Sequence, residues 1–181
     1  PQSAAPRQGL AFQQSVALAG QVHPLAIARY DRGAVADSLE LPHMVLVLKH
    51  TAGQEQALAT LIDQLHDPKS PMYHHWLSPQ EFGRFFGPSD AELQALTGWL
   101  EASGFTVDEV SPGRTTIILS GNAAQVRQTF GTAIHAFDVN GVRHVANVSN
   151  PQIPAALAPL VEGFRSLNDF AAKPLHHLVG G

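Results

Sequence analysis

The chain has 181 residues, enough for one domain with a hydrophobic core and an additional tail. Its net charge of −4, without a basic cluster, excludes an ordinary nucleic-acid-binding surface. No apolar run reaches the roughly 20 residues of a membrane-spanning helix, and no signal peptide is visible at the N-terminus. The absence of cysteine excludes disulfides and thiol catalysis. The ten histidines are unusual: protonating all of them would add ten charges to −4 and give +6.

The first 41 residues show no sustained hydrophobic periodicity and are predicted to form an arm or partly ordered tail. The domain itself is expected to cover residues 42–170. Five consecutive apolar residues, Met44 to Leu48, predict a central strand that is buried on both faces. A helix follows over 53–67, with an apolar face made by Leu58, Leu61, Ile62 and Leu65.

Two capping boxes mark the next helical starts, at 78–81 and at 89–92. The helix that begins after the second box is predicted to run to about Ser103, where Gly104 ends it. Its inward residues are expected to be Leu93, Leu96 and Leu100.

Strand patterns at 105–110 and 115–121 flank a turn, and a short helix capped by Asn122 follows them. Asn140-Gly141 then predicts a β-hairpin, because both residues tolerate positive φ angles. The remaining segment, up to about residue 167, is expected to add a helical turn and a final strand.

This order contains a split β-α-β unit. It predicts an α+β fold of the ferredoxin-like type: an antiparallel sheet with helices on one face, plus an inserted helix and hairpin. The residues expected in its core are Leu46, Leu61, Leu96, Ile118 and Phe130.

The sequence contains only weak evidence for a metal site or for catalytic residues. His74 and His75 are adjacent, so their side chains diverge on regular backbone, and a zinc site needs three or four convergent ligands. A structural role is favoured for them, although a metal-binding protein using both and the pair His176 and His177 stays open. Ser120 lacks the flanking pattern of a serine nucleophile, and no nucleophile, base and orienting group can be assembled.

Large apolar side chains are dense between residues 73 and 86, which predicts a core or a partner surface. Such side chains more often form a core than a partner surface. If they do both, Trp76 or Phe86 would be partly exposed. The residues are Tyr73, Trp76, Leu77, Phe82, Phe85 and Phe86.

The segment 67–105 resembles the activation domain that precedes sedolisin (kumamolisin-type) serine-carboxyl peptidases. The family pattern runs Asp-Pro-x-Ser-Pro-x-Tyr-His-x-Trp-Leu, then Phe-Gly-Pro-Ser, then Trp-Leu-x-x-x-Gly-Phe. The resemblance extends over roughly 22–170. The signature residues that carry it are Asp67, Pro68, Ser70, Pro71, Tyr73, His74, Trp76, Leu77, Phe86, Gly87, Trp99, Gly104 and Phe105.

This resemblance implies a secreted propeptide that covers the active site of a downstream peptidase, helps it to fold and is removed in acid. The catalytic Glu, Asp and Ser, and a Ca²⁺ site, would belong to the peptidase region. The chain itself would then have no catalytic residue, no cofactor and no nucleic-acid or membrane partner. Residues 171–181 would be a linker, with candidate cleavage positions at Lys173, Pro174, His176, His177 and Gly180. The alternative is a free-standing ferredoxin-like binding or inhibitor module.

Overall fold

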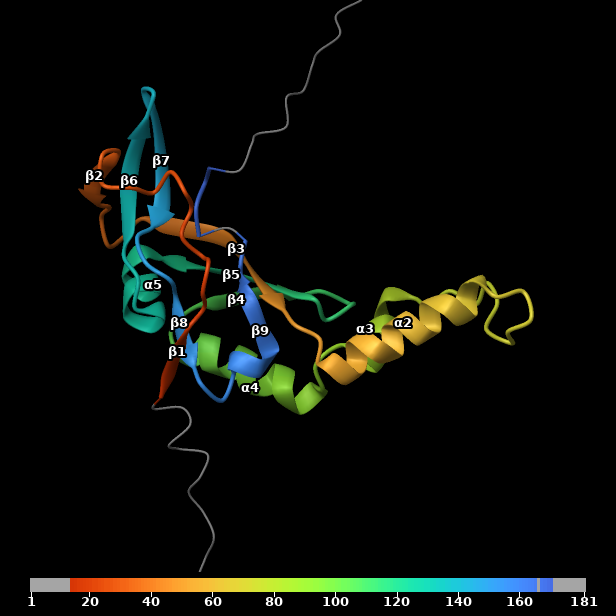
Figure 1. Ribbon diagram of the computed structural model, residues 1–181. Helices are drawn as coiled ribbons and strands as arrows, with labels where there is room; N and C mark the ends of the chain where they lie inside the picture. The colour runs from red at the N-terminus through yellow and green to blue at the C-terminus, as the bar shows by residue number, and fades with distance from the viewer. Residues whose placement is uncertain (1–13, 166, 171–181) are drawn as a thin grey trace, which may run out of the picture.

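The computed structural model describes residues 14–165 and 167–170, which form a body of sheets and helices with a projecting helical hairpin (Figure 1). Its four-stranded antiparallel sheet has the order β4-β5-β3-β9. The strands are β4 (Thr106–Val110), β5 (Thr116–Asn122), β3 (Glu40–Leu48) and β9 (Val161–Phe164). Because β3 and β5 are central and the strands are joined as a split β-α-β unit, the predicted ferredoxin-like α+β fold is confirmed.

Two helices, α4 (Asp90–Ala102) and α5 (Ala123–Phe130), cover one face of this sheet (Figure 1). Both begin as the sequence predicted, since Ser89 and Asn122 accept hydrogen bonds from the backbone of the first turn. The α4 helix stops before Gly104, whose φ of 93° is the left-handed conformation that glycine adopts readily. The buried core between the helices and the sheet includes Met44, Leu46, Leu48, Leu96, Leu100, Ile117, Leu119, Val126 and Phe130.

The other face of the sheet is only half-buried, which corrects two predictions. Met44, Leu46 and Leu48 are buried, but the intervening Val45 and Val47 are intermediate, so β3 is not buried on both faces. Ile118 is intermediate for the same reason, because side chains alternate along a strand and its neighbours take the core face. The position of β3 at the centre of the sheet is as predicted.

A second sheet has the order β2-β6-β7 and is made of β2 (Asp31–Ala34), β6 (Ile134–Val139) and β7 (Val142–Asn147). The predicted hairpin joins β6 to β7, with Asn140 at a φ of 55° and Gly141 at 81°. Positive φ at both central residues is the geometry of a type I′ turn, which matches the twist of the two strands. The sequence pattern therefore predicted this hairpin from its turn chemistry.

The predicted arm is wrong for the residues from 14 to 41. There, β1 (Ser15–Ala17) pairs with β8 (Gln152–Pro154), and β2 pairs with β6. Leu18 is buried in the main core. Strands as short as β1 and β2 show little hydrophobic periodicity. The sequence therefore did not indicate that they pair with strands far away in the chain. Residues 1–13 lie outside the described part of the chain.

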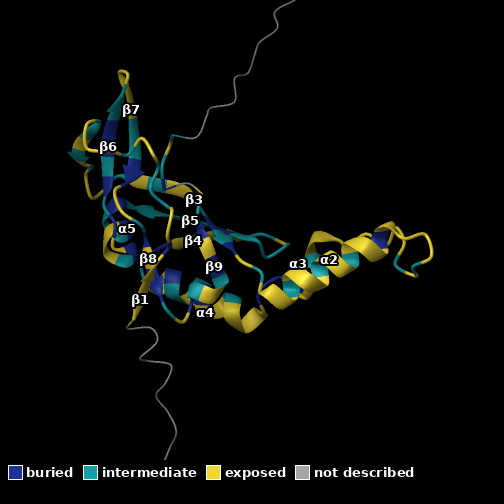
Figure 2. Ribbon diagram, in the orientation of Figure 1, coloured by how far each residue is buried: buried dark blue, intermediate teal, exposed yellow. Residues whose placement is uncertain are grey.

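The helical hairpin consists of α2 (Ala52–His66) and α3 (Pro79–Phe86), which pack on each other and point away from the sheet (Figure 1). It is largely exposed, in contrast to the body (Figure 2). Leu65 is the buried residue of α2, whereas Leu61 is intermediate, so the prediction that Leu61 belongs to the core is wrong. The apolar face of α2 was correctly placed on a helix, but it packs on α3 instead of on the sheet.

The last two elements of the described chain are a short 3₁₀ turn, η1 (Ala158–Leu160), and β9, which follows it directly. This agrees with the predicted helical turn and final strand. In the described parts of the chain, no helix has the length and apolar character that crossing a membrane requires.

Candidate interaction surface

The signature residues fall into two groups in the structure. Those from Asp67 to Gly87 form the tip and the returning helix of the hairpin, whereas Trp99, Gly104 and Phe105 lie at the end of α4 in the body. Trp99 and Phe105 both contact Phe130, with ring centroids 5.8 and 5.1 Å apart. The signature is thus split between core packing and the projecting hairpin.

The hairpin tip is held by its own signature residues. The Asp67 carboxylate accepts a hydrogen bond from the backbone N–H of Lys69 at 2.9 Å, and the Ser70 hydroxyl accepts one from Met72 at 3.0 Å. The backbone N–H of His74 returns to the carbonyl of Leu65 at 3.2 Å and so ties the loop to α2. Pro68 and Pro71 are exposed between these contacts and restrict the backbone.

His74 takes part in an aromatic stack at this tip. Its ring lies 3.8 Å from that of Tyr73 and 6.2 Å from that of Trp76, and the ring of His66 meets Trp76 edge-on at 5.8 Å. Its φ of 57° is uncommon for a residue with a side chain. His74 is exposed at the tip and contacts these neighbouring aromatic rings. A structural role for it stays a prediction. Among the described residues, no group of three His, Asp or Glu could hold a metal ion.

The aromatic residues of 73–86 are mixed in burial. The rings of Phe82 and Phe86 lie 5.3 Å apart, and Phe86 is buried. The ring of Phe82 also lies 5.8 Å from that of His50, just before α2. Trp76 and Phe85, however, are 63% and 62% exposed. The structure thus shows the mixed use of these aromatics, with Trp76 exposed as that alternative allowed. Phe86, the other residue that it named, is buried, and the exposure of Phe85 was not predicted.

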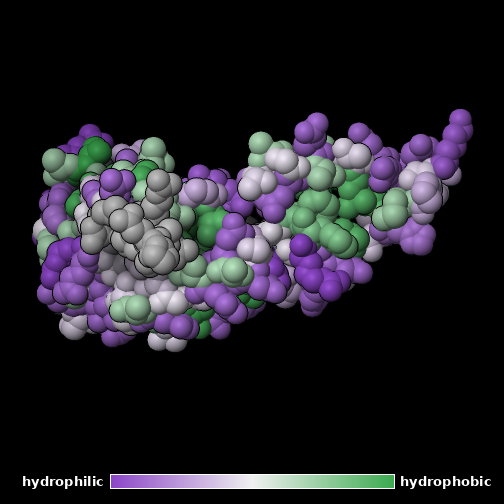
Figure 3. Space-filling view, turned by 90° about the horizontal axis from the view of Figure 1, so that it is seen from below, coloured by the Kyte–Doolittle hydropathy of each residue, from purple (hydrophilic) through white to green (hydrophobic). Residues whose placement is uncertain are grey.

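An open apolar hollow lies on the hairpin, with a volume of about 340 Å³. We call its lining the hairpin patch, which consists of Ala57, Leu61, Met72, Leu77, Phe85 and Phe86. Figure 3 shows apolar residues gathered on the projecting hairpin. Leu77 and Phe86 of the signature belong to this patch. No local pattern predicted that Phe85 would be exposed, because it lies on the same short helix as the packed Phe82 and Phe86.

Close packing fixes α3 on the turn between β4 and β5. A Cβ atom at Gly83 would lie 2.4 Å from the carbonyl oxygen of Pro112, and one at Gly87 would lie 2.6 Å from the Cβ of Arg114. Gln54 donates a hydrogen bond to the carbonyl of Gly87 at 3.0 Å. Glycine at 83 and 87 is therefore required for the close approach of the hairpin to the body.

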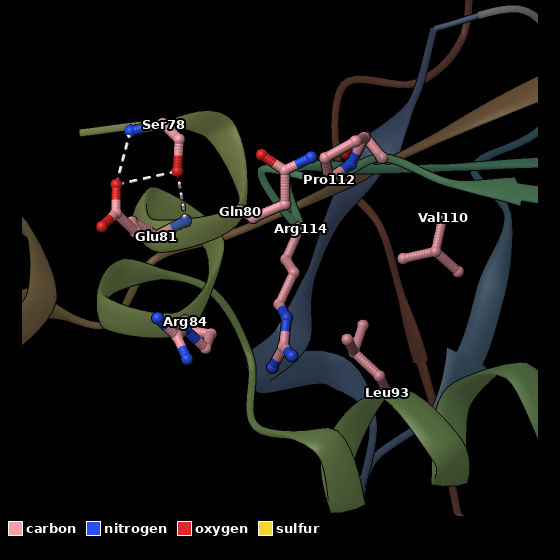
Figure 4. Close-up of a pocket in the computed structure, with 9 residues that line it drawn as sticks. Ser78, Gln80, Glu81, Arg84, Leu93, Val110, Pro112 and Arg114 are labelled. Atoms are coloured by element: carbon pink, nitrogen blue, oxygen red, sulfur yellow. Dashed lines mark hydrogen bonds between the residues drawn. The ribbon is translucent and has the colours of Figure 1, made fainter.

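A polar groove of about 730 Å³ lies beside this contact, between α3, α4 and the β4–β5 turn (Figure 4). Two of its charged groups, Arg114 and Glu81, have structural partners. Arg114 donates to the carbonyl of Pro88 at 2.8 Å and to Asp90, and Glu81 accepts from the backbone N–H and hydroxyl of Ser78 at 2.8 Å. The N–H of Ser78 lowers the pKa of Glu81. The Ser78–Glu81 pair is thus a helix cap, not a catalytic serine and carboxylate.

The hydrogen bonding of Ser120 also differs from that of a catalytic serine. Ser120 donates to the Asp108 carboxylate at 2.5 Å, while the His43 ring lies 3.9 Å from the same carboxylate. In a catalytic triad the serine hydroxyl donates to the imidazole. The hydroxyl hydrogen of Ser120 is committed to Asp108, so this cluster does not have that geometry.

Carboxylates pair with basic groups around the second sheet. Asp31 accepts from the backbone N–H of Gly33 at 2.7 Å and pairs with His135 at 2.9 Å, and the pKa of Asp31 is lowered, first by Gly33 and also by His135. Asp37 pairs with Arg127, which lowers the pKa of Asp37. Both pairs join residues near β2 to the body, so they favour the folded state while the carboxylates are ionised.

The last described residues are fastened to β7. Asp169 accepts from the backbone N–H of Val145 at 2.8 Å and contacts the His144 ring at 3.2 Å. The Phe170 ring stacks between His23 and His144, each 4.3 Å away. The candidate cleavage positions Lys173, Pro174, His176, His177 and Gly180 lie outside the described residues.

The pro-kumamolisin activation domain family model matches residues 29–170 of this chain. The chain belongs to this family. The match begins at residue 29, inside the segment that the sequence pattern assigned to an arm. Because the match spans the hairpin, both sheets and α5, the fold described above is that of the activation domain.

The activation domain also matches curated proteins. It is 31% identical to xanthomonalisin of Xanthomonas sp. (strain T-22) over 148 residues, which are 81% of this chain and 18% of that protein. It is 30% identical to sedolisin of Pseudomonas sp. (strain 101) over 122 residues, 67% of this chain and 20% of that protein. Kumamolisin of Bacillus sp. (strain MN-32) is 26% identical over 151 residues, 83% of this chain and 27% of that protein. The chain spans about a fifth to a quarter of these relatives.

Proposed function

We propose that this chain is the propeptide of a downstream, acid-acting serine-carboxyl endopeptidase of the sedolisin type. It masks the active site of that peptidase, assists its folding and is removed by proteolysis in acid. The observation that carries this proposal is the family match over residues 29–170, together with relatives of which the matched region is a small part. By the same resemblance, the precursor is secreted.

The chain acts in this proposal as a binding domain and not as an enzyme. Catalytic Glu, Asp and Ser, and the Ca²⁺ site, belong by resemblance to the peptidase domain, and we assign no cofactor to the propeptide. The serine and carboxylate pairs described above, Ser78 with Glu81 and Ser120 with Asp108, support this assignment because they serve capping and strand contacts.

Masking and assisted folding follow from one property, which is binding to the folded peptidase. A folded domain that lies over a cleft excludes substrates from it. A partner that binds the folded state and not the unfolded state also stabilises the folded state by mass action. The body is suited to this role because its core is closed by its own helices and strands.

Release in acid is supported by the charge of the chain. Lowering the pH protonates histidines near pH 6.5 and carboxylates near pH 4, so the net charge changes from negative to positive. A carboxylate that pairs with a basic group across the interface loses its charge, and a buried neutral histidine gains one; both changes weaken an interface that was complementary at neutral pH. The midpoint of release would identify which kind of group governs it.

The proposal is tested with the peptidase domain that it places in the same precursor. The chain is added to the mature peptidase, and its inhibition constant is measured from pH 7 to pH 3. We expect inhibition near neutral pH that weakens in acid. A gene without a peptidase domain, or a chain that leaves the peptidase fully active at pH 7, would favour the alternative of a free-standing binding or inhibitor module. An inhibition constant that stays flat with pH would leave cleavage as the means of release.

A further inference from the structure

The hairpin patch has no covering element within the described chain. Phe85 is 62% exposed, while Leu61, Met72 and Leu77 are only half-buried around the same hollow. Contiguous apolar surface of this kind in a soluble domain usually marks an interaction site. We propose that the hairpin patch is a docking site for an apolar protrusion on the peptidase domain of the same precursor. This inference rests on the proposed function.

The patch is preorganised for binding. Two contacts anchor the hairpin to the body: the close approach of Gly83 to Pro112 and the Arg114 contacts described above. A hydrogen bond from Gln54 to the Gly87 carbonyl holds α2 to the end of α3 within the hairpin. The tip is closed by the Asp67 and Ser70 hydrogen bonds. Because both ends are fixed before a partner arrives, docking costs little conformational entropy.

The shape of the patch indicates the chemistry of its occupant. A hollow of about 340 Å³ lined by aliphatic, methionine and phenylalanine side chains accepts a Leu, Ile, Met or Phe side chain from another surface. Phe85 lines the hollow and is exposed, so a side chain inserted there would bury it. An aromatic residue that is desolvated on binding is the usual form of an interface hot spot.

The peptidase domain is the favoured occupant over an unrelated protein or a second copy. The curated relatives extend far beyond the matched region, which makes up 18 to 27% of their length. A domain on the same polypeptide is present at a high effective concentration, so a small patch can bind it without a large interface. The projecting hairpin would then reach a part of the peptidase surface that the body does not contact.

The experiment compares Phe85→Gln with the wild-type chain, using the mature peptidase domain of the same precursor at pH 7. Phe85→Gln should raise the inhibition constant by at least about tenfold, because a hot-spot side chain is lost. Phe85→Leu, which keeps an apolar side chain, should stay near the wild type. The matched control is Val142→Gln, which places the same polar side chain at a residue that is 56% exposed on the β6–β7 hairpin; it should change inhibition less than twofold.

Hydrogen exchange supplies a second measurement beside the inhibition constant. Hydrogen exchange of the wild-type complex should show added protection at residues 57–61 and 72–86, and this measurement does not depend on the folding of a variant. Wild-type inhibition that is unaltered by Phe85→Gln, with no added protection in the hairpin, would overturn the docking site and leave the proposed function intact. A chain that neither binds nor inhibits the peptidase would overturn both. Self-association of the free chain that Phe85→Gln abolishes would show a second copy as the occupant and overturn the assignment to the peptidase.

Discussion

The body and the helical hairpin use similar amphipathic helices in opposite ways. In the body, α4 and α5 bury Leu96, Leu100, Val126 and Phe130 against the sheet. In the hairpin, α2 buries Leu65 while Leu61 remains half-exposed, and α3 leaves Phe85 uncovered. An apolar helix face therefore shows that a helix packs on something, but not whether its partner is the sheet, another helix or another domain.

The largest effect is expected at the centre of the body. Phe130 is fully buried, and its ring contacts Trp99, Phe105 and Phe164 at 4.8 to 5.8 Å. Phe130→Ala should lower the free energy of unfolding by about 3–5 kcal/mol, because it removes an aromatic side chain and leaves a cavity. Urea denaturation followed by circular dichroism measures this loss. A loss below about 1 kcal/mol would show that α5 does not close the core.

A smaller loss is expected where the hairpin meets the body. Gly83→Ala should cost about 1–3 kcal/mol, since the new methyl group meets the Pro112 carbonyl and the backbone must move. Gly98→Ala is the matched control: a Cβ there meets nothing within 4 Å, so this substitution in the middle of α4 should stabilise the chain by about 0.5–1 kcal/mol. Equal effects of the two substitutions in thermal unfolding would contradict the described contact.

The hairpin itself should contribute less than the body to stability. Leu61→Ala should cost about 1 kcal/mol, below the range of about 2–5 kcal/mol expected of a buried leucine such as Leu96. Urea denaturation of Leu61→Ala and Leu96→Ala gives the difference directly. If both variants lose the same free energy, α2 is packed more fully than the structure shows.

The smallest effect concerns the pairs around the second sheet. The pKa of Asp31 is lowered in the folded state, so its stabilising contribution is present above the unfolded pKa and is lost as the pH falls through the folded pKa. Asp31→Asn should therefore lower the melting temperature at pH 6 more than at pH 3, by less than the core substitutions do. A melting-temperature difference that is independent of pH would show that the ionised carboxylate does not stabilise the fold.

Local signals in the sequence were sufficient to predict several helix starts, in the body and in the hairpin, and the β6–β7 turn. The caps at Ser78, Ser89 and Asn122 and the Asn140-Gly141 turn depend on the chemistry of a few neighbouring residues, and each has the expected geometry. The strands at 15–17 and 31–34 were missed because their partners, β8 and β6, are more than 100 residues away in the sequence. Pairing over that distance leaves no local pattern.

The candidate site was harder to predict for a related reason. The sequence identified the signature from Asp67 to Phe105 and the dense aromatics within it, but it could not assign them to core or surface. Trp76 is exposed and Phe86 is buried although both belong to one run of large side chains. Trp76 lies at the hairpin tip beside the rings of His66 and His74, whereas Phe86 ends α3 and packs beside Phe82. No short-range sequence pattern distinguishes these two environments.

Refolding of the downstream peptidase domain in the presence of this chain is the most direct test of the central claim. The denatured peptidase domain is diluted into buffer at neutral pH with the wild-type chain, with Phe130→Ala or with no addition, and activity is measured after acidification. We predict recovery of active peptidase with the wild-type chain, reduced recovery with the destabilised variant and little recovery without any chain. Equal recovery in all three would contradict a role in assisting the folding of the peptidase.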